Sequence, residues 1–206
     1  MSVIDHIRQS PHRNKLERYI TRTLPSLAGP ILDIGSKNRR YDHLLLTEAP
    51  VAIDLVENPL RKVQKGDIMH LQFPESSFQS IICLEVLEYV DDPREAFSEI
   101  HRVLIPGGTL VLSVPFMFKL HEDKLRYTAP HLEELLAAFS IDQFHAVGGS
   151  YTSMLTILWG KIKSLSFAPF RYLFTALFLP LLMLSIPTTE ASKKYASGYF
   201  IVAKKI

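Results

Sequence analysis

Acidic residues at the ends of apolar segments could hold a nucleoside in this chain. The stretch "GPILDIG" over 29–35 is a short apolar segment ending in an acid and a glycine, where a strand can hand over to a helix. Asp54 ends a second such segment about twenty residues after Gly35, where a carboxylate that accepts hydrogen bonds from two ribose hydroxyls is expected. Asp67 follows one strand later and could meet an adenine edge. A lone acid at a strand end is more often a turn former, so the joint spacing carries this prediction.

The turn "DIGSKNRR" over 33–40 departs from the glycine-rich pattern of nucleotide-binding turns. Lys37 and Arg39 occupy places where further glycines are expected, because the backbone must approach a ligand closely there. We expect both side chains to point away from the ligand, with Tyr41 closing over it. A Lys37 side chain in the site would instead favour a non-catalytic protein.

The elements that must position these residues alternate between strands and helices. Apolar residues recur at helical spacing over 14–24, 93–104 and 129–139. Short apolar segments predict strands at 30–34, 51–55, 80–84, 108–114, 141–147 and 198–205. Strands separated by crossovers of this length indicate an α/β fold, with a parallel sheet and helices on both faces.

Composition limits the remaining choices. A length of 206 residues suits one domain over 1–206, and a net charge of +2 gives no reason to expect nucleic acid as a partner. The single cysteine, Cys83, fits a reducing cytoplasm and lies in an apolar strand typical of core. The charged N-terminus lacks an apolar stretch of signal-peptide length, which supports a cytoplasmic location. No metal-ligand pattern such as "HExxH" is present, so no metal is expected.

The segment from 66 to 116 carries a resemblance to a known family. It reads "GDIMHLQFPESSFQSIICLEVLEYVDDPREAFSEIHRVLIPGGTLVLSVPF" and resembles the central region of class I S-adenosylmethionine-dependent methyltransferases, in the type 11 group. The resemblance covers about 30–147 and the final strand. It implies a Rossmann-like seven-stranded sheet whose last strand is antiparallel, with a core of 25–149 and 196–206. An apolar helical insertion, 151–187, would precede that last strand.

The resemblance also implies S-adenosyl-L-methionine as cofactor and a set of residues that bind it. They follow the first four strands: Asp33, Gly35, Ser36 and Tyr41 at the methionine end, Asp54 and Leu55 at the ribose, Asp67 and Ile68 at the adenine, and Leu84 and Glu85 beside the cofactor.

The methyl acceptor requires a base only if it carries a proton that must leave. The segment "PFMFKLHEDKLRYTAPH" over 115–131 resembles an acceptor-side run of some of these enzymes. We predict His121 as the base or orienting group, with Tyr127 second. The alternative is that His121 and Asp123 form a surface hydrogen bond and Arg126 a helix-capping ion pair.

The insertion is unusually apolar. Its run "YLFTALFLPLLMLSI" over 172–186 is shorter than the ~20 residues that span a bilayer, and Pro180 interrupts it. Lys161, Lys163 and Arg171 among aromatic residues favour a segment that lies in a membrane interface. A lid over the active site and a homodimer interface remain alternatives.

These observations lead to one function and one rival. We expect a cytoplasmic methyltransferase, peripheral on the inner face of the membrane, that acts on a small-molecule or lipid-linked acceptor. The rival is a non-catalytic binding or scaffold protein of the same fold, associated with the membrane. Two acids beside the ligand argue against a phosphate-bearing nucleotide, because their charges would repel it.

Overall fold

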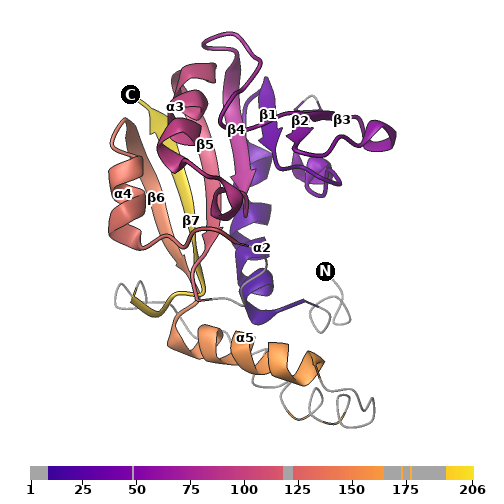
Figure 1. Ribbon diagram of the computed structural model, residues 1–206, viewed down its shortest axis with the longest axis vertical. Helices are drawn as coiled ribbons and strands as arrows, with labels where there is room; N and C mark the ends of the chain where they lie inside the picture. Colours follow the sequence, from indigo (N-terminus) through magenta and orange to yellow (C-terminus); the bar gives the residue numbers. More distant parts are fainter. Residues whose placement is uncertain (1–8, 48, 118–122, 165–172, 174–176, 178–193) are drawn as a thin grey trace.

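The structure is a computed structural model that describes residues 9–47, 49–117, 123–164, 173, 177 and 194–206. Strands and helices alternate along most of it (Figure 1). The strands are β1 (Ile31–Ile34), β2 (Val51–Asp54), β3 (Val63–Lys65), β4 (Phe78–Leu84), β5 (Leu104–Pro115), β6 (Phe139–Val147) and β7 (Gly198–Lys205). The α-helices are α2 (Pro11–Thr23), α3 (Pro93–Val103), α4 (Ala129–Leu135) and α5 (Ser150–Lys163). Single 3₁₀ turns are η1 (Leu24–Ser26), η2 (Asp42–Leu44), η3 (Pro59–Arg61) and η4 (Leu87–Tyr89).

The strands form one seven-stranded sheet in the order β3-β2-β1-β4-β5-β7-β6. Every pair from β3 to β5 is parallel, whereas β7 runs antiparallel to both β5 and β6. This is the predicted Rossmann-like sheet with an antiparallel last strand, so the fold prediction is confirmed.

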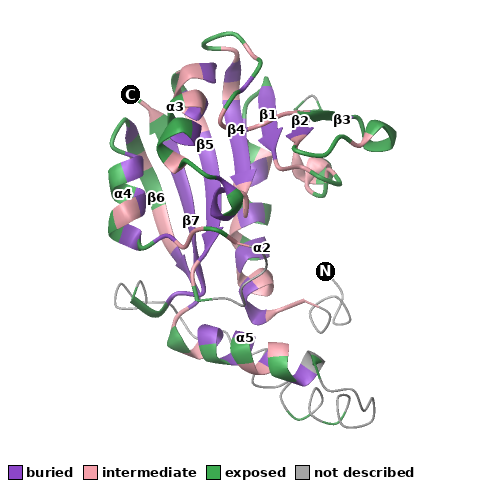
Figure 2. Ribbon diagram, in the orientation of Figure 1, coloured by how far each residue is buried: buried purple, intermediate pink, exposed green. Residues whose placement is uncertain are grey.

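Helices cover both faces of the sheet, and buried residues lie where they pack on the strands (Figure 2). The side chains along each strand alternate between the two faces, so the molecule has two hydrophobic cores. On β4, Ile81 and Cys83 face one core and Ile82 faces the other. Helix α2 buries Leu16 and Ile20 on the Ile82 side, while α3, α4 and η4 bury their apolar residues on the opposite side. Cys83 is fully buried, as predicted for a core cysteine.

Several helix boundaries differ from those expected, for local reasons. Helix α2 begins at Pro11 rather than 14, because the Ser10 hydroxyl accepts a hydrogen bond from Arg13 N at 3.1 Å and caps the helix. Helix α4 ends at Leu135 rather than 139, because Phe139 already begins β6. Helix α3 begins at Pro93 with Asp92 as its cap, as expected.

Only the first part of the apolar insertion is described. Helix α5 lies at the end of the molecule where β5 and β6 finish and β7 begins (Figure 1). Residues 165–172, 174–176 and 178–187 of the insertion lie outside the described residues. Within the ranges that the structure describes, the helices fall short of the length and apolarity that a membrane crossing requires.

Candidate cofactor-binding site

A cleft of about 710 Å³ lies beyond the carboxyl ends of β1 to β4. Successive strands run outward in one direction from β1 to β3 and in the other from β4 to β5, so the order reverses between β1 and β4. Open α/β sheets bind ligands at such a reversal. The residues that line the cleft come from four strand ends and one later loop: Ile34, Gly35, Lys37, Asn38, Asp54, Leu55, Val56, Glu57, Asn58, Gly66, Asp67, Ile68, Met69, Glu85, Val86, Tyr89, Val90, Asp91 and Lys124.

The turn after β1 packs closely against the start of the loop after β4. Gly35 has a φ of +71°, and a Cβ added to it would lie 2.3 Å from Val86 Cγ2. Its N–H and that of Ser36 both donate to Ile53 O, at 2.9 and 3.1 Å. A glycine is therefore required here by both its conformation and its surroundings.

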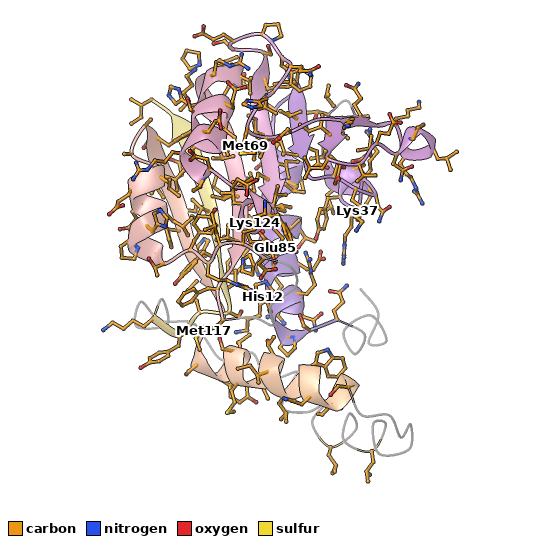
Figure 3. The ribbon with its side chains drawn as sticks, in the orientation of Figure 1. His12, Lys37, Met69, Glu85, Met117 and Lys124 are labelled. Carbon is orange, nitrogen blue, oxygen red and sulfur yellow. The ribbon has the colours of Figure 1, made fainter. Side chains whose placement is uncertain are left out.

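Lys37 and Arg39 keep the backbone conformation of the glycines that they replace. Their φ angles are 43° and 53°, in the left-handed region that side chains disfavour. The Arg39 guanidinium is held outside the cleft, because it donates to Asp42 Oδ2 at 2.6 Å, Lys62 O at 3.2 Å and Pro50 O at 3.1 Å. The prediction that Arg39 points away is confirmed, whereas Lys37 is exposed and is among the residues that line the cleft (Figure 3).

The acid that ends β2 ties two turns together. One Asp54 carboxylate oxygen accepts a hydrogen bond from Lys37 N and the other from Val56 N, both at 3.2 Å. Each carboxylate oxygen can accept a second hydrogen bond, so the group keeps capacity for two ribose hydroxyls. Leu55, which follows it, lines the cleft and is 63% exposed.

The acid after β3 is also partly used by the backbone. Asp67 Oδ1 accepts a hydrogen bond from Met69 N at 2.9 Å, in a turn that Ile68 occupies. Asp67 and Ile68 both line the cleft. A carboxylate beside a backbone N–H can pair with the amino group and ring nitrogen of a purine.

Glu85 lies at the β4 end of the cleft, with a φ of 58°. Its Oε1 accepts a hydrogen bond from the Ser113 hydroxyl at 3.1 Å, and its Oε2 lies 3.5 Å from His12 Nε2. Burial by itself raises the pKa of this carboxyl, but the His12 side chain and the nearby Arg13 charge outweigh burial, and the pKa is lowered. Glu85 is therefore held as an anion.

Four of the predicted cofactor-binding residues do not line the cleft. Asp33 is buried below the turn, and burial raises its pKa to about 7. Ser36 lies in the turn, and its side-chain hydrogen bond with Asp33 opposes the effect of burial on the Asp33 pKa. Tyr41 lies toward α2, where its hydroxyl donates to Glu17 Oε1 at 3.0 Å. Leu84 packs against the core on the α2 side.

Of the two predicted catalytic residues, the structure describes Tyr127, which does not line the cleft. His121 lies outside the described residues. Tyr127 is fully buried, and its hydroxyl donates to Leu87 O at 2.7 Å, so burial raises its pKa and the side chain belongs to the core. This placement gives no support to a catalytic role for Tyr127. Asp123 forms an ion pair with Arg126 and has a buried side chain, so it is not the surface residue that the alternative predicted. The N-cap of α4 is Thr128, and the predicted hydrogen bond between His121 and Asp123 involves a residue outside the described ones.

Sequence reasoning missed a buried polar group beside Glu85. His12 is 2% exposed, and its Nδ1 lies 2.8 Å from the Ser197 hydroxyl. These two residues are 185 positions apart, and neither belongs to a recognisable motif. Glu88 was also missed, although it is 2% exposed and has a carboxyl oxygen without a hydrogen-bond partner.

The chemistry of the cleft fits S-adenosylmethionine. The lining carries five carboxylates and two ammonium groups, one of which, on Lys124, is paired with Asp91 at 2.5 Å. A cofactor with a sulfonium and an ammonium group suits such a lining, whereas a phosphate would be repelled. Gly35 places no side chain where a ligand must approach. Among the described residues, no three His, Cys, Asp or Glu side chains are grouped so that they could hold a metal ion.

Comparisons with known proteins agree with this reading. Residues 32–112 match the model of a methyltransferase domain. A protein of Mycolicibacterium smegmatis named as a probable S-adenosylmethionine-dependent methyltransferase is 28% identical over 128 residues, which are 62% of this chain and 50% of that protein. The chain thus spans half the length of that relative.

Two solved structures share the fold at low sequence identity. The [4+2]-cyclase SpnF superimposes with a TM-score of 0.62 at 16% identity, over 94% of this chain and 80% of the cyclase. A S-adenosylmethionine-dependent methyltransferase from Mesorhizobium loti gives a TM-score of 0.59 at 16% identity, over 93% of this chain and 98% of that one.

The likeness to these structures shows the fold, and the domain match covers the cleft-forming part of the chain. S-adenosylmethionine is the cofactor that goes with the matched family. Over residues 32–112, the chain is therefore similar to the methyltransferase domain family, and it carries a class I methyltransferase fold.

Proposed function

We propose that this chain is an S-adenosylmethionine-dependent methyltransferase that acts on a small-molecule or lipid-linked acceptor at a membrane surface. The observation that carries the proposal is the acid-lined cleft at the reversal of strand order, inside the matched methyltransferase domain. Asp54 would hold the ribose, and Asp67 with Ile68 would hold the adenine. Gly35 would let the backbone of the β1 turn come close to the methionine part.

The chain's task in such a reaction is mainly to position its ligands. When bound, the cofactor supplies an activated methyl group on a sulfonium, so alignment of the acceptor provides much of the rate. The short turns that fix Asp54 and Asp67 through backbone N–H groups serve this alignment, because they prevent either carboxylate from moving with the ligand.

The lipid-linked acceptor and the membrane location rest on the insertion. On α5, Met154 and Ile157 are 57% and 54% exposed and lie one turn apart, and the exposed Lys161 follows one turn later. Leu173 and Leu177, in the same insertion, are 56% and 63% exposed. Apolar side chains beside a lysine on one helix face are typical of segments that lie in a bilayer interface. We propose that the chain lies on the inner face of the membrane. The competing proposal is that the exposed face of α5 forms a homodimer interface.

The activity can be tested without knowledge of the acceptor. The full chain and methyl-labelled S-adenosylmethionine are incubated in two separate reactions. One contains the lipid fraction of a cell extract, and the other contains the aqueous fraction. We expect label to enter the lipid fraction and to be lost with Asp54→Asn. Label in the aqueous fraction alone would contradict the lipid-linked acceptor, and label in neither would contradict the activity.

The membrane contact has its own test with a matched control. Met154→Glu with Ile157→Glu should abolish sedimentation with phosphatidylcholine–phosphatidylglycerol vesicles. Leu60→Glu should leave sedimentation unchanged, because this residue is 97% exposed on η3 and lies outside α5. A wild-type protein that stays in the supernatant would rule out the contact, and a concentration-dependent dimer lost in the double variant would assign the face to self-association.

The rival function keeps one observation in its favour. Lys37 lines the cleft, and an ammonium group there opposes the positive charges of S-adenosylmethionine. A non-catalytic binding or scaffold protein would show vesicle binding without methyl transfer, and Lys37→Gly would not restore transfer.

A further inference from the structure

The hydrogen bonds around His12 determine which of its ring nitrogens carries a proton. The Ser197 hydroxyl donates its single hydrogen to Val147 O at 2.5 Å. Its contact with His12 Nδ1 at 2.8 Å must then use the oxygen as acceptor, so Nδ1 carries a proton. The other nitrogen, Nε2, faces Glu85 Oε2 at 3.5 Å. The charge of the His12 ring, when it is protonated, lowers the pKa of the Glu85 carboxyl.

The histidine ring is built tightly into this position. Gly198 begins β7, and a Cβ added to it would lie 2.7 Å from His12 Cε1. The His12 backbone N–H also donates to the Thr156 hydroxyl of α5 at 3.3 Å. The ring is therefore fixed between β7 and α5, and it meets the carboxylate from the side away from the cleft.

Glu85 is fixed from several sides. Its backbone N–H donates to Ser113 O at 2.9 Å, while the Ser113 hydroxyl donates to its carboxylate at 3.1 Å. Its side chain is 16% exposed, and the residue lines the cleft. Figure 3 shows Glu85 between Lys124 and His12 in the middle of the molecule. Glu85 also has a left-handed backbone, which is unfavourable at a non-glycine residue and which the surrounding contacts must stabilise.

We propose that Glu85 is the residue by which the cleft distinguishes the charged cofactor from its neutral product, and that His12 positions this carboxylate and moderates its charge. The inference rests on the proposed function. Asp54 and Asp67, assigned to the adenosine part, follow β2 and β3, whereas Glu85 follows β4 at the opposite end of the same cleft. The reactive part of the cofactor is the part left for that end.

This assignment has a direct electrostatic consequence. S-adenosylmethionine carries a sulfonium, and S-adenosylhomocysteine carries an uncharged thioether in its place, while the adenosine parts are the same. A carboxylate near the sulfur favours the first ligand, and a partly buried unit charge changes an affinity by about tenfold. Charges near the adenosine part alter both affinities alike.

The test measures calorimetric affinities of the full chain for the two ligands. We expect Glu85→Gln to lower the preference for S-adenosylmethionine over S-adenosylhomocysteine by about tenfold. His12→Gln should raise that preference by about threefold, because it removes the positive neighbour of the carboxylate. Asp54→Asn is the matched control, and it should weaken both ligands by the same factor.

The outcomes separate this inference from the proposed function. If the wild-type chain binds neither ligand, the proposed function fails. If the wild type binds both and Glu85→Gln weakens both equally, the proposed function stands and the inference is overturned. If Glu85→Gln and His12→Gln both lower the preference for S-adenosylmethionine, the site is generally loosened. That result would remove the role assigned to His12.

Discussion

Glu88 makes the unfolding free energy depend on pH in a way that one substitution should remove. Its side chain is 2% exposed on η4, and Oε2 has no hydrogen-bond partner. Burial, and then the charge of Glu85, raise its pKa from the ordinary 4.5 to about 8. The folded chain therefore holds this proton more tightly than the unfolded chain does.

The sign follows from that difference. The stabilisation due to the bound proton is complete below pH 4.5 and is lost as the pH rises toward about 8. At about 1.4 kcal/mol per pH unit, the loss amounts to about 4 to 5 kcal/mol. Above the pKa of Glu88 in the folded chain, its contribution to the free energy of unfolding no longer changes with pH.

Glu88→Gln keeps the size of the side chain and removes the titration. Urea unfolding, followed by circular dichroism at pH 5, 7 and 9, should show a wild-type free energy of unfolding that falls by about 4 kcal/mol more than that of the variant between pH 5 and pH 9. The control Glu134→Gln, at an exposed position of α4, should show the same change in free energy of unfolding with pH as the wild type. Parallel curves for the wild type and Glu88→Gln would refute the reasoning, whatever their vertical offset.

Three further substitutions test the turn and the core. Tyr127→Phe removes one of the two donors to the Leu87 carbonyl, leaves Val90 N at 3.4 Å, and should lower the free energy of unfolding in urea by about 1 kcal/mol; an unchanged midpoint would show that this hydrogen bond is dispensable. Gly35→Ala should cost about 2 kcal/mol or more and weaken cofactor binding, since the new methyl group meets Val86 at a positive φ; calorimetry would contradict this if affinity were unchanged. Arg39→Gly relieves a strained φ but removes an ion pair and two hydrogen bonds, so thermal unfolding should show a net loss of about 1 kcal/mol, and a gain would mean that strain dominates.

The parts of the cleft that could be predicted lie at strand ends. Asp54 ends the apolar strand β2 and Asp67 follows β3, and the carboxyl ends of parallel strands meet at one edge of a sheet. Residue spacing along the chain therefore carries over into space at these positions. The antiparallel last strand was predicted from the resemblance to the family, and β7 confirms it.

Other parts depend on contacts that no local pattern encodes. His12 and Ser197 meet across nearly the whole chain, and their contact exists only because α2 and β7 pack together. Tyr127 has the residue type of a catalytic group, but burial and the Leu87 carbonyl make it a core residue. The left-handed backbone of Lys37 accompanies a hydrogen bond from its N–H to Asp54, a contact that the residue type alone does not predict.

The central claim is that the acid-lined cleft beyond β1 to β4 binds S-adenosylmethionine. Calorimetric titration of the full chain with this ligand tests it most directly, with Asp54→Asn as the comparison and adenosine diphosphate as the phosphate-bearing competitor. We predict saturable binding of one ligand per chain, weakened at least tenfold by Asp54→Asn through loss of a charged hydrogen-bond acceptor, and no competition from the diphosphate. An absence of binding at millimolar S-adenosylmethionine, or equal binding by the wild type and Asp54→Asn, would contradict it.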